Sequence, residues 1–195
     1  MGIKQYVGIS RDHSASMSGI VKAAMNDYNS LIGDIKAAAA AENIDTIVST
    51  VLNGIGPGNG KVRRDVVNSS VHRLEPLRTY PANGNSTPLW DSVGELIEIF
   101  ESVPNYHDLD VSFMVMVVTD GGENSSTKWS TSKLAEKIRE LQKSDRWTFV
   151  FRVPRGQRQS LIRNLGVYDD NVIEWDAGSS KDLERTTVVN SAATR

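Results

Sequence analysis

Apolar positions along the chain switch between the two-residue period of strands and the spacing of amphipathic helices. Residues 3–10 mix β-branched and aromatic side chains and run into a polar loop, which predicts a first strand. From Ile20 apolar residues recur at helical spacing up to an alanine run at 37–41, which predicts a long helix. Residues 45–53 then predict a strand, 54–60 a turn and 61–73 a returning strand.

The second half of the chain continues this alternation. After a loop at 81–86, Thr87 and Pro88 mark the start of a helix, because proline lacks an N–H that the first turn does not need. Residues 111–119 are nearly all apolar, as expected of a central parallel strand that helices cover on both sides. The remaining predicted elements are a helix at 133–143, a strand at 147–153, a helix at 158–165 that stops at Gly166, and a strand at 171–175.

The order of these elements predicts the α/β class. We expect a Rossmann-like, mostly parallel central β-sheet with amphipathic helices on both faces and right-handed crossovers. The 195 residues fit a single domain, 1–195, with a weakly structured tail from about residue 180. In such sheets ligands bind where loops converge at the carboxyl ends of strands, so a functional site is expected at that edge.

Charge and composition narrow the classes of partner. With 22 basic and 24 acidic residues the net charge is -2, which gives no global field to attract nucleic acid or a membrane surface. No apolar run is long enough to span a bilayer, and the first residues lack the hydrophobic core of a signal peptide. The absence of cysteine excludes thiolate metal sites and is compatible with a reducing compartment. We therefore expect a cytoplasmic protein whose partner is selected locally.

Polar side chains gather at three of the predicted strand and helix ends. Asp12, Ser14 and Ser16 follow the first strand at alternate positions, so an extended loop would turn these side chains toward one centre. Thr87 stands at a helix start, and Asp120 follows the most hydrophobic strand. All five offer oxygen, the ligand atom that Mg²⁺ and Mn²⁺ prefer. The sequence therefore predicts one divalent metal site at this edge.

The order D-x-S-x-S, distant threonine, distant aspartate resembles the metal ion-dependent adhesion site of the von Willebrand factor type A family. Asp12, Ser14, Ser16, Thr87 and Asp120 match its positions in order, and the likeness runs from about residue 4 to about residue 176. The resemblance implies that the hydroxyls contact the ion directly, that one or both aspartates act through water, and that one coordination position stays open. It implies a non-enzymatic protein-binding module whose ion, Mg²⁺ with Mn²⁺ or Ca²⁺ as alternatives, is completed by an Asp or Glu of a protein partner.

Two positions depart from the family pattern. Ala15 stands where glycine is usual, and its Cβ disfavours a positive φ, so the loop is expected to be slightly altered. Arg11 precedes Asp12 where an aliphatic residue is usual, and a guanidinium near the site would weaken the affinity for a cation. Both departures leave the five oxygen ligands in place.

Other interpretations of these residues remain open. An aspartate after the first strand also begins Mg²⁺-dependent phosphoryl-transfer sites, but that chemistry usually needs a second carboxylate where Ser14 stands. A scaffold with only a structural metal is a further alternative. Asp, Ser and Thr are also favoured helix N-caps, which is the simpler interpretation of Thr87 taken alone. The glycine-rich residues 54–60 are interpreted as a hairpin loop, because Pro57 removes an amide that a phosphate loop would need.

A few side chains outside the five are candidates for partner contact. Arg155 follows the strand at 147–153, at the edge of the proposed ion, where it would help to attract an acidic partner. It belongs to a basic stretch with Arg152, Arg158 and Arg163, which is interpreted as a solvated face. Tryptophans more often pack in a core or at an edge, but Trp129 lies in the polar loop 125–132, where exposure would make it the aromatic candidate for partner contact. The histidines show no spacing for zinc and are assigned no role: His13, His72 and His107.

Overall fold

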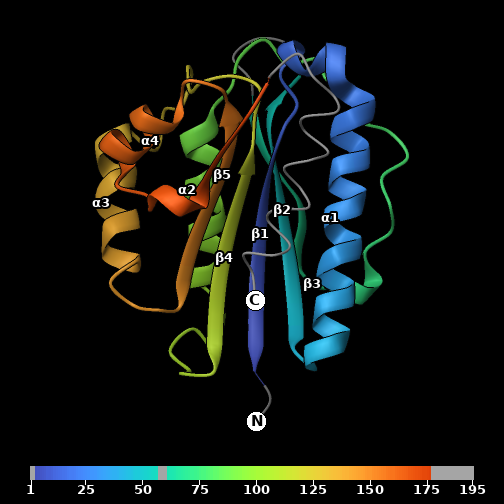
Figure 1. Ribbon diagram of the computed structural model, residues 1–195, viewed down its shortest axis with the longest axis vertical. Helices are drawn as coiled ribbons and strands as arrows, with labels where there is room; N and C mark the ends of the chain where they lie inside the picture. The colour runs from blue at the N-terminus through green and yellow to red at the C-terminus, as the bar shows by residue number, and fades with distance from the viewer. Residues whose placement is uncertain (1–2, 57–60, 177–195) are drawn as a thin grey trace.

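Figure 1 shows the computed structural model of the chain, which describes residues 3–56 and 61–176. The predicted tail and part of the predicted turn at 54–60 lie outside these residues. The strands are β1 (Lys4–Asp12), β2 (Asp45–Ile55), β3 (Lys61–Ser70), β4 (Val111–Val118), β5 (Trp147–Pro154) and β6 (Val172–Trp175). The α-helices are α1 (Val21–Glu42), α2 (Leu89–Glu101), α3 (Thr131–Leu141) and α4 (Arg158–Leu165), and the 3₁₀ turns are η1 (Ala15–Ile20), η2 (Val71–Arg73) and η3 (Asp169–Asn171).

The strands form one sheet in the order β3-β2-β1-β4-β5-β6. Every neighbouring pair is parallel except β2 and β3, which confirms both the mostly parallel sheet and the returning strand. The chain moves outward from β1 to β2 on one side and returns to β4 on the other, so β1 and β4 form the topological switch point of the sheet. Their register pairs Arg11 with Val118, which brings the residues after both strands to the same level.

Helices cover both faces of the sheet, as the sequence predicts. In the described residues α1 covers one face, while α2, α3 and α4 supply apolar side chains to the core on the other (Figure 1). Successive residues of β1 serve the two cores in turn: Tyr6 packs beneath α2, and Val7 and Ile9 pack beneath α1. The central strands β1, β4 and β5 are therefore buried on both sides, and the polar edge at their carboxyl ends is left for function.

The first strand is longer than the sequence predicts. It continues past Ser10 to Asp12, because its pairing with β2 extends to a register match between Asp12 and Asn53. The main chain of Asp12 is consequently fixed by the sheet rather than by a loop.

Arg152 corrects the interpretation of the basic stretch as a solvated face. Its side chain is only 1% exposed and donates two hydrogen bonds, of 2.9 and 2.7 Å, to the carboxylate of Asp27 on α1. Arg152 lies two residues after Val150, so both side chains point to the face beneath α1. A buried guanidinium requires an anionic partner, and Asp27 supplies it.

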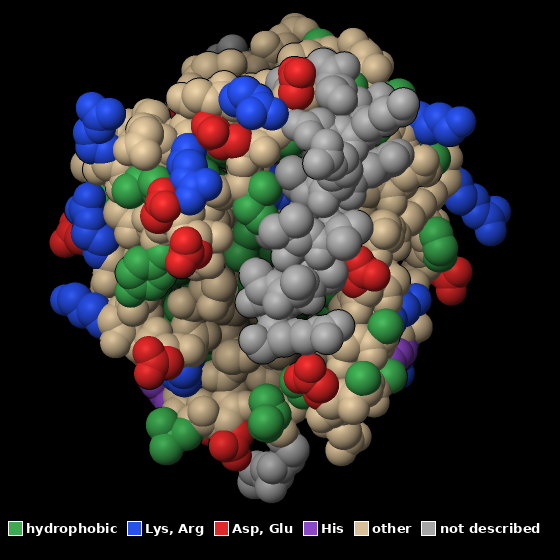
Figure 2. All heavy atoms as spheres, in the orientation of Figure 1, with side chains coloured by type: hydrophobic (Ala, Val, Ile, Leu, Met, Phe, Trp, Pro, Cys, Tyr) green, Lys and Arg blue, Asp and Glu red, His purple; other side chains and the backbone are tan. Residues whose placement is uncertain are grey.

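The surface carries charges of both signs. On the face shown in Figure 2, basic and acidic side chains are intermixed over the described residues. Within 3–56 and 61–176, no helix is both long enough and apolar enough to cross a membrane.

A glycine contact provides a test of the packing between α2 and the loop before α3. A Cβ on Gly94 would come within 2.1 Å of the indole nitrogen of Trp129. We expect Gly94→Ala to lower the free energy of unfolding by about 1–3 kcal/mol through overpacking, as measured by urea denaturation. The matched control is Gly33→Ala on α1, where a Cβ meets nothing within 4 Å.

That control should raise stability by about 0.5–1 kcal/mol, because alanine is the better helix former. Equal effects of the two substitutions would contradict the close contact of Trp129 with α2.

Candidate functional site

Asp12, the last residue of β1, has a carboxylate that is wholly buried. Its Oδ1 accepts a hydrogen bond from the backbone N–H of Ser14 at 2.9 Å. Its Oδ2 accepts one from the hydroxyl of Thr119 at 2.6 Å. Thr119, the residue after β4, was not singled out from the sequence, and the register of β1 with β4 is what brings it here.

Ser14, Ser16 and Asp120 form a chain of side-chain hydrogen bonds beside Asp12. The hydroxyls of the two serines lie 2.9 Å apart, and Ser16 donates to Asp120 Oδ1 at 2.8 Å. Because Ser16 and Asp120 are 104 positions apart in the chain, this contact is a product of the fold. Four of the five residues predicted from the sequence therefore gather at one point.

The local backbone differs from the predicted extended loop. A 3₁₀ turn, η1, begins at Ala15, which does not have a positive φ; the alanine therefore causes no backbone strain. Ser14 precedes this turn, yet its side chain makes no capping hydrogen bond. The two serine hydroxyls thus turn toward Asp120 instead of capping, which argues against the helix-cap interpretation.

Thr87 lies on the long connection between η2 and α2 and is buried. Its backbone N–H donates to Asn124 Oδ1 at 2.7 Å, and the nearby Gly84 pairs as a parallel bridge with Ser14. Within the described residues its hydroxyl makes no hydrogen bond to the other four predicted ligands. The main chain thus brings Thr87 toward the cluster, but the structure does not join its side chain to it.

The capping interpretation of Thr87 is wrong. Helix α2 begins at Leu89, and the residue before it makes no side-chain capping bond. The acceptor at the start of α2 is instead Glu123, in the loop after β4. Its carboxylate accepts a hydrogen bond from the backbone N–H of Trp90 at 2.8 Å. A carboxylate at a helix N-terminus also interacts favourably with the helix dipole.

Glu123 and Asp91 together fasten the loop after β4 to the start of α2. The Glu123 carboxylate also accepts hydrogen bonds of 2.6–2.8 Å from its own loop, from Ser125 N, Ser126 N and Ser126 Oγ. Asp91, in the first turn of α2, accepts three more at 2.7–3.0 Å from Thr127 N, Lys128 N and Trp129 N. These two residues were missed from the sequence, although an acid soon after a predicted helix start was a usable signal for Asp91.

The cluster is anionic, and the described residues supply it with no basic counter-charge. Among the described residues, neither Asp12 nor Asp120 forms an ion pair with a basic side chain. Burial, and then repulsion from Asp12, raise the pKa of Asp120 above its ordinary value, although the hydrogen bond from Ser16 opposes this. Buried carboxylates in proteins are normally paired with a cation or bound to a metal. The arrangement is therefore suited to a bound cation.

Arg11 does not supply that charge. Its guanidinium is buried on the α1 face, where it pairs with Asp65 on β3 and lies 4.7 Å from the centre of the Tyr28 ring. The adjacent Ser10 points the other way and lies 2.7 Å from the hydroxyl of Ser92 on α2. Because neighbouring side chains of a strand point to opposite faces, Arg11 is directed into the core beneath α1, and its charge is balanced by Asp65. The expectation that Arg11 weakens the site is not supported.

Trp129 is buried, which confirms the packing interpretation and contradicts the alternative of an exposed aromatic for partner contact. Its side chain is 6% exposed and packs into the core against α2, where Gly94 leaves room for it. The ammonium group of Lys133 lies 4.1 Å from the ring centre and covers the indole. The polar sequence around Trp129 therefore concealed a core residue.

Arg155 lies where the sequence places it. It directly follows β5 and is exposed. Its backbone N–H donates a hydrogen bond to the carbonyl of Trp175 on β6 at 2.9 Å. Since β5 runs parallel to β4, Arg155 is at the same edge of the sheet as Asp120. The next arginine, Arg158, is neutralised by Asp169 at 2.7 Å.

The donor set fits a hard divalent cation. The two carboxylates and the serine hydroxyls are oxygen ligands of the kind that Mg²⁺ binds. In the part of the chain that the structure describes, no cluster of three or more His, Cys, Asp or Glu side chains could hold a metal. Hydroxyl oxygens would therefore have to complete the shell of any ion here, and this edge presents them.

The fold and this cluster define the class of protein: an α/β domain with a candidate cation site at the switch point of its sheet. No family model and no curated protein sequence match the chain. Among solved structures, proximal thread matrix protein 1 from the mussel byssus superposes with a TM-score of 0.65 at 13% identity, covering 96% of this chain and 47% of that one. A structure of the same protein with a zinc-occupied MIDAS motif has a TM-score of 0.61 at 14% identity, with 99% and 46% covered.

Two further structures share the fold. The pilus adhesin SpaC from Lactobacillus rhamnosus GG has a TM-score of 0.67 at 11% identity, covering 99% of this chain and 30% of that one. A von Willebrand factor type A structure from Catenulispora acidiphila has a TM-score of 0.54 at 18% identity, with 98% and 42% covered. The chain spans half or less of the length of each of these chains. It has the von Willebrand factor type A fold.

The hydrogen bonds of Glu123 make it a test of how the loop after β4 is held. We expect Glu123→Gln to lower the free energy of unfolding by about 1.5–3 kcal/mol, because a charged acceptor of several N–H groups is lost. Urea denaturation measures the change. Glu136→Gln, at an exposed position of α3, is the control and should stay within about 0.5 kcal/mol of the parent. An equally small effect at Glu123 would contradict its role in joining the loop to α2.

Proposed function

We propose that this domain is a metal-dependent protein-binding module whose divalent ion, Mg²⁺ first, is held by Asp12, Ser14, Ser16, Thr87 and Asp120. The observation that carries the proposal is the convergence of two carboxylates and two serine hydroxyls, to which residues 3–56 and 61–176 contribute no basic partner. Asp12 ends β1, and the two serines and Asp120 lie in the loops that follow β1 and β4, where ligands bind in sheets of this type.

Hydrogen bonds among the ligands support a role in holding a cation. The chain Ser14–Ser16–Asp120 keeps the three oxygen-bearing groups together, and Thr119 fixes one oxygen of Asp12. The bond from Ser14 N fixes the other oxygen of Asp12, so its carboxylate is held on both sides. Such support orients ligands and sharpens metal affinity. In this proposal Thr87 supplies a third hydroxyl from the segment that Gly84 pairs with Ser14.

The bound ion would act as an acceptor for a partner's carboxylate. With hydroxyls as direct ligands the ion keeps most of its positive charge, so an Asp or Glu of another protein completes its coordination. The structural neighbours include a pilus adhesin and a byssal thread matrix protein, which fits a binding role over an enzymatic one. Arg155, exposed at the same edge, would assist by attracting an acidic partner.

Metal binding is the first consequence to test. We expect Mg²⁺ or Mn²⁺ to bind at one site per chain, with heat in a calorimetric titration. Because an ion that binds only the folded state stabilises it, saturating Mg²⁺ at about 100 times its Kd should add about 2.7 kcal/mol to the free energy of unfolding. Sodium chloride of equal ionic strength is the control. No heat, and no difference between the two salts, would count decisively against the proposal.

Asp120 separates a ligand role from a structural one. We expect Asp120→Ala to remove Mg²⁺-dependent stabilisation and partner binding while circular dichroism and metal-free melting stay close to the parent, because the residue lies at the edge and outside the apolar cores. Asp110→Ala, an exposed aspartate at the opposite end of β4, removes the same charge and should change neither property. A collapsed spectrum for Asp120→Ala would make this residue structural instead.

EDTA distinguishes the proposed function from the two alternatives. Immobilised chain should retain its protein partner in Mg²⁺ and release it in excess EDTA, and changing the partner's contacting Asp or Glu to its amide should have the same effect. Binding at full strength in EDTA would leave a metal-independent scaffold. Mg²⁺-dependent hydrolysis of p-nitrophenyl phosphate that Asp12→Asn abolishes would instead support the phosphoryl-transfer alternative.

A further inference from the structure

The segment 74–88 joins η2 to α2, carries Thr87, and lacks regular helix or strand throughout. Connections of this length without secondary structure are uncommon in compact domains and are usually functional. Its first part is tied to α1: Lys36 donates to the carbonyl of Leu74 at 2.7 Å, and the Asn29 amide exchanges two hydrogen bonds with the main chain of Leu77, at 2.7 and 3.0 Å. Other contacts hold its second part, which lies next to the proposed cation site.

His13 and Tyr80 join this second part of the segment to the loop after β1. Their rings stack with centroids 4.3 Å apart and planes 11° apart. Each ring is also bonded to the other's chain segment: the Tyr80 hydroxyl donates to the carbonyl of Asp12 at 2.6 Å, and His13 Nδ1 donates to the carbonyl of Pro81. The two loops are therefore joined by a stacked pair with reciprocal hydrogen bonds.

The effect of this pair is visible a few residues further on. Just past Pro81, Gly84 N donates to the carbonyl of His13 at 3.2 Å, and Ala15 N donates to the carbonyl of Gly84 at 2.6 Å. These bonds align Gly84 with Ser14 in the loop after β1. Gly84 is three residues before Thr87, so the alignment is close to Thr87 in the chain. The side chain of His13 points away from the cluster of oxygen ligands, toward Tyr80, and this frees it for such a role.

We propose that His13 and Tyr80 are positioning residues of the cation site, which hold the segment carrying Thr87 against the end of β1 at Asp12 and the loop carrying Ser14. The effect on metal binding rests on the proposed function, whereas the joining of the two segments rests on the stacked contact itself. Because the rings pack against each other, neither loop can shift without breaking the stack and both hydrogen bonds. The third hydroxyl ligand is thereby held at the site from a segment that has no secondary structure of its own.

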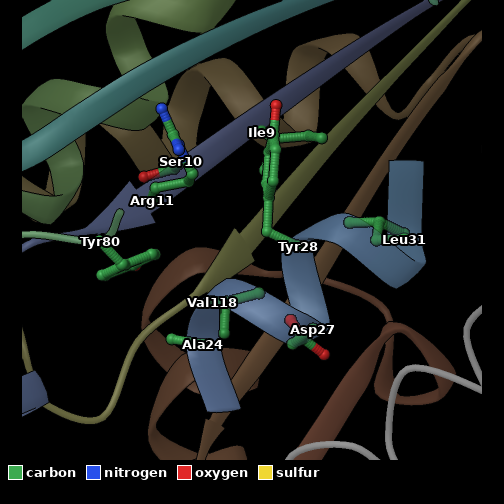
Figure 3. A pocket seen from close by; sticks show the side chains of 9 residues that line it. All are labelled: Ile9, Ser10, Arg11, Ala24, Asp27, Tyr28, Leu31, Tyr80 and Val118. Atoms are coloured by element: carbon green, nitrogen blue, oxygen red, sulfur yellow. The ribbon is translucent and has the colours of Figure 1, made fainter. Parts of the chain in front are cut away.

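The Tyr80 hydroxyl can be tested separately from its ring. The ring borders a cavity of about 20 Å³ together with Arg11, Tyr28 and Asp27 (Figure 3), so removing the whole side chain would open the core. Tyr80→Phe keeps the ring and deletes only the bond to Asp12. The matched control is Tyr6→Phe, since Tyr6 donates a hydroxyl hydrogen bond of 2.8 Å to Asn105 near the opposite end of the sheet.

The first readout is amide hydrogen exchange in EDTA, followed by NMR at Ala15 and Gly84. We expect Tyr80→Phe to accelerate exchange at both amides about threefold to tenfold, as the loss of one hydrogen bond allows. His13→Leu, which removes the ring stack and the bond to Pro81, should accelerate exchange further. Tyr6→Phe should leave these two amides at the parent rate even where it lowers the melting temperature equally. Identical rates at Ala15 and Gly84 in Tyr80→Phe and Tyr6→Phe would overturn the inference.

The second readout is Mg²⁺ affinity by calorimetry, well below the melting temperature. Tyr80→Phe should weaken binding by a similar factor of about three to ten, and Tyr6→Phe should not. Faster exchange with unchanged affinity would overturn the claim that the pair positions ion ligands. If the parent chain binds no Mg²⁺, the proposed function fails by itself, and the exchange rates alone decide whether the pair holds the two loops together.

Discussion

The parallel pairing of β1 with β4 is the constraint on which the candidate site depends. Its register sets Arg11 beside Val118, so the chain leaves both strands at the same level. Asp12 and Thr119 then meet at 2.6 Å, and Asp120 follows within reach of Ser16. A one-residue slip would turn every side chain of β1 to the other face and separate these groups. Burial of the sheet on both sides fixes that register energetically.

Buried charges are balanced beneath α1 but not at the carboxyl edge of the sheet, among the described residues. Beneath α1, the guanidinium groups of Arg152 and Arg11 are buried, and each is paired with an aspartate, Asp27 and Asp65 respectively. At the carboxyl edge the situation is reversed, because buried Asp12 and half-buried Asp120 have no basic partner among the described residues. Since the described part of the chain supplies counter-charges to the two buried arginines and none to this pair of carboxylates, the edge is suited to a cation from solution.

Hydrogen bonds of side chains, instead of secondary structure, hold the long connections in place. Glu123 and Asp91 fasten the loop after β4 to the first turn of α2, and Tyr80 with His13 fastens the segment before α2 to the end of β1. Thr87 lies between these two attachments along the chain, and its N–H is itself bonded to Asn124. The loop after β4 is thus anchored to α2 and the segment before α2 to the end of β1, so that the proposed ligands from three parts of the chain are held by a common set of contacts.

The sequence by itself determined the elements, their α/β order and the oxygen-rich positions at the strand ends, because hydrophobic period and turn chemistry are local properties. It could not determine where Arg152, Trp129 and Thr87 direct their side chains, nor that His13 stacks on Tyr80. Those outcomes rest on contacts between residues such as Tyr80 and Asp12, 68 positions apart, or Arg152 and Asp27, 125 apart. Local pattern carries no information on such pairs. Only the packing of α1, the sheet and the long connections decides which polar side chain finds its partner inside and which is left at the edge for a ligand.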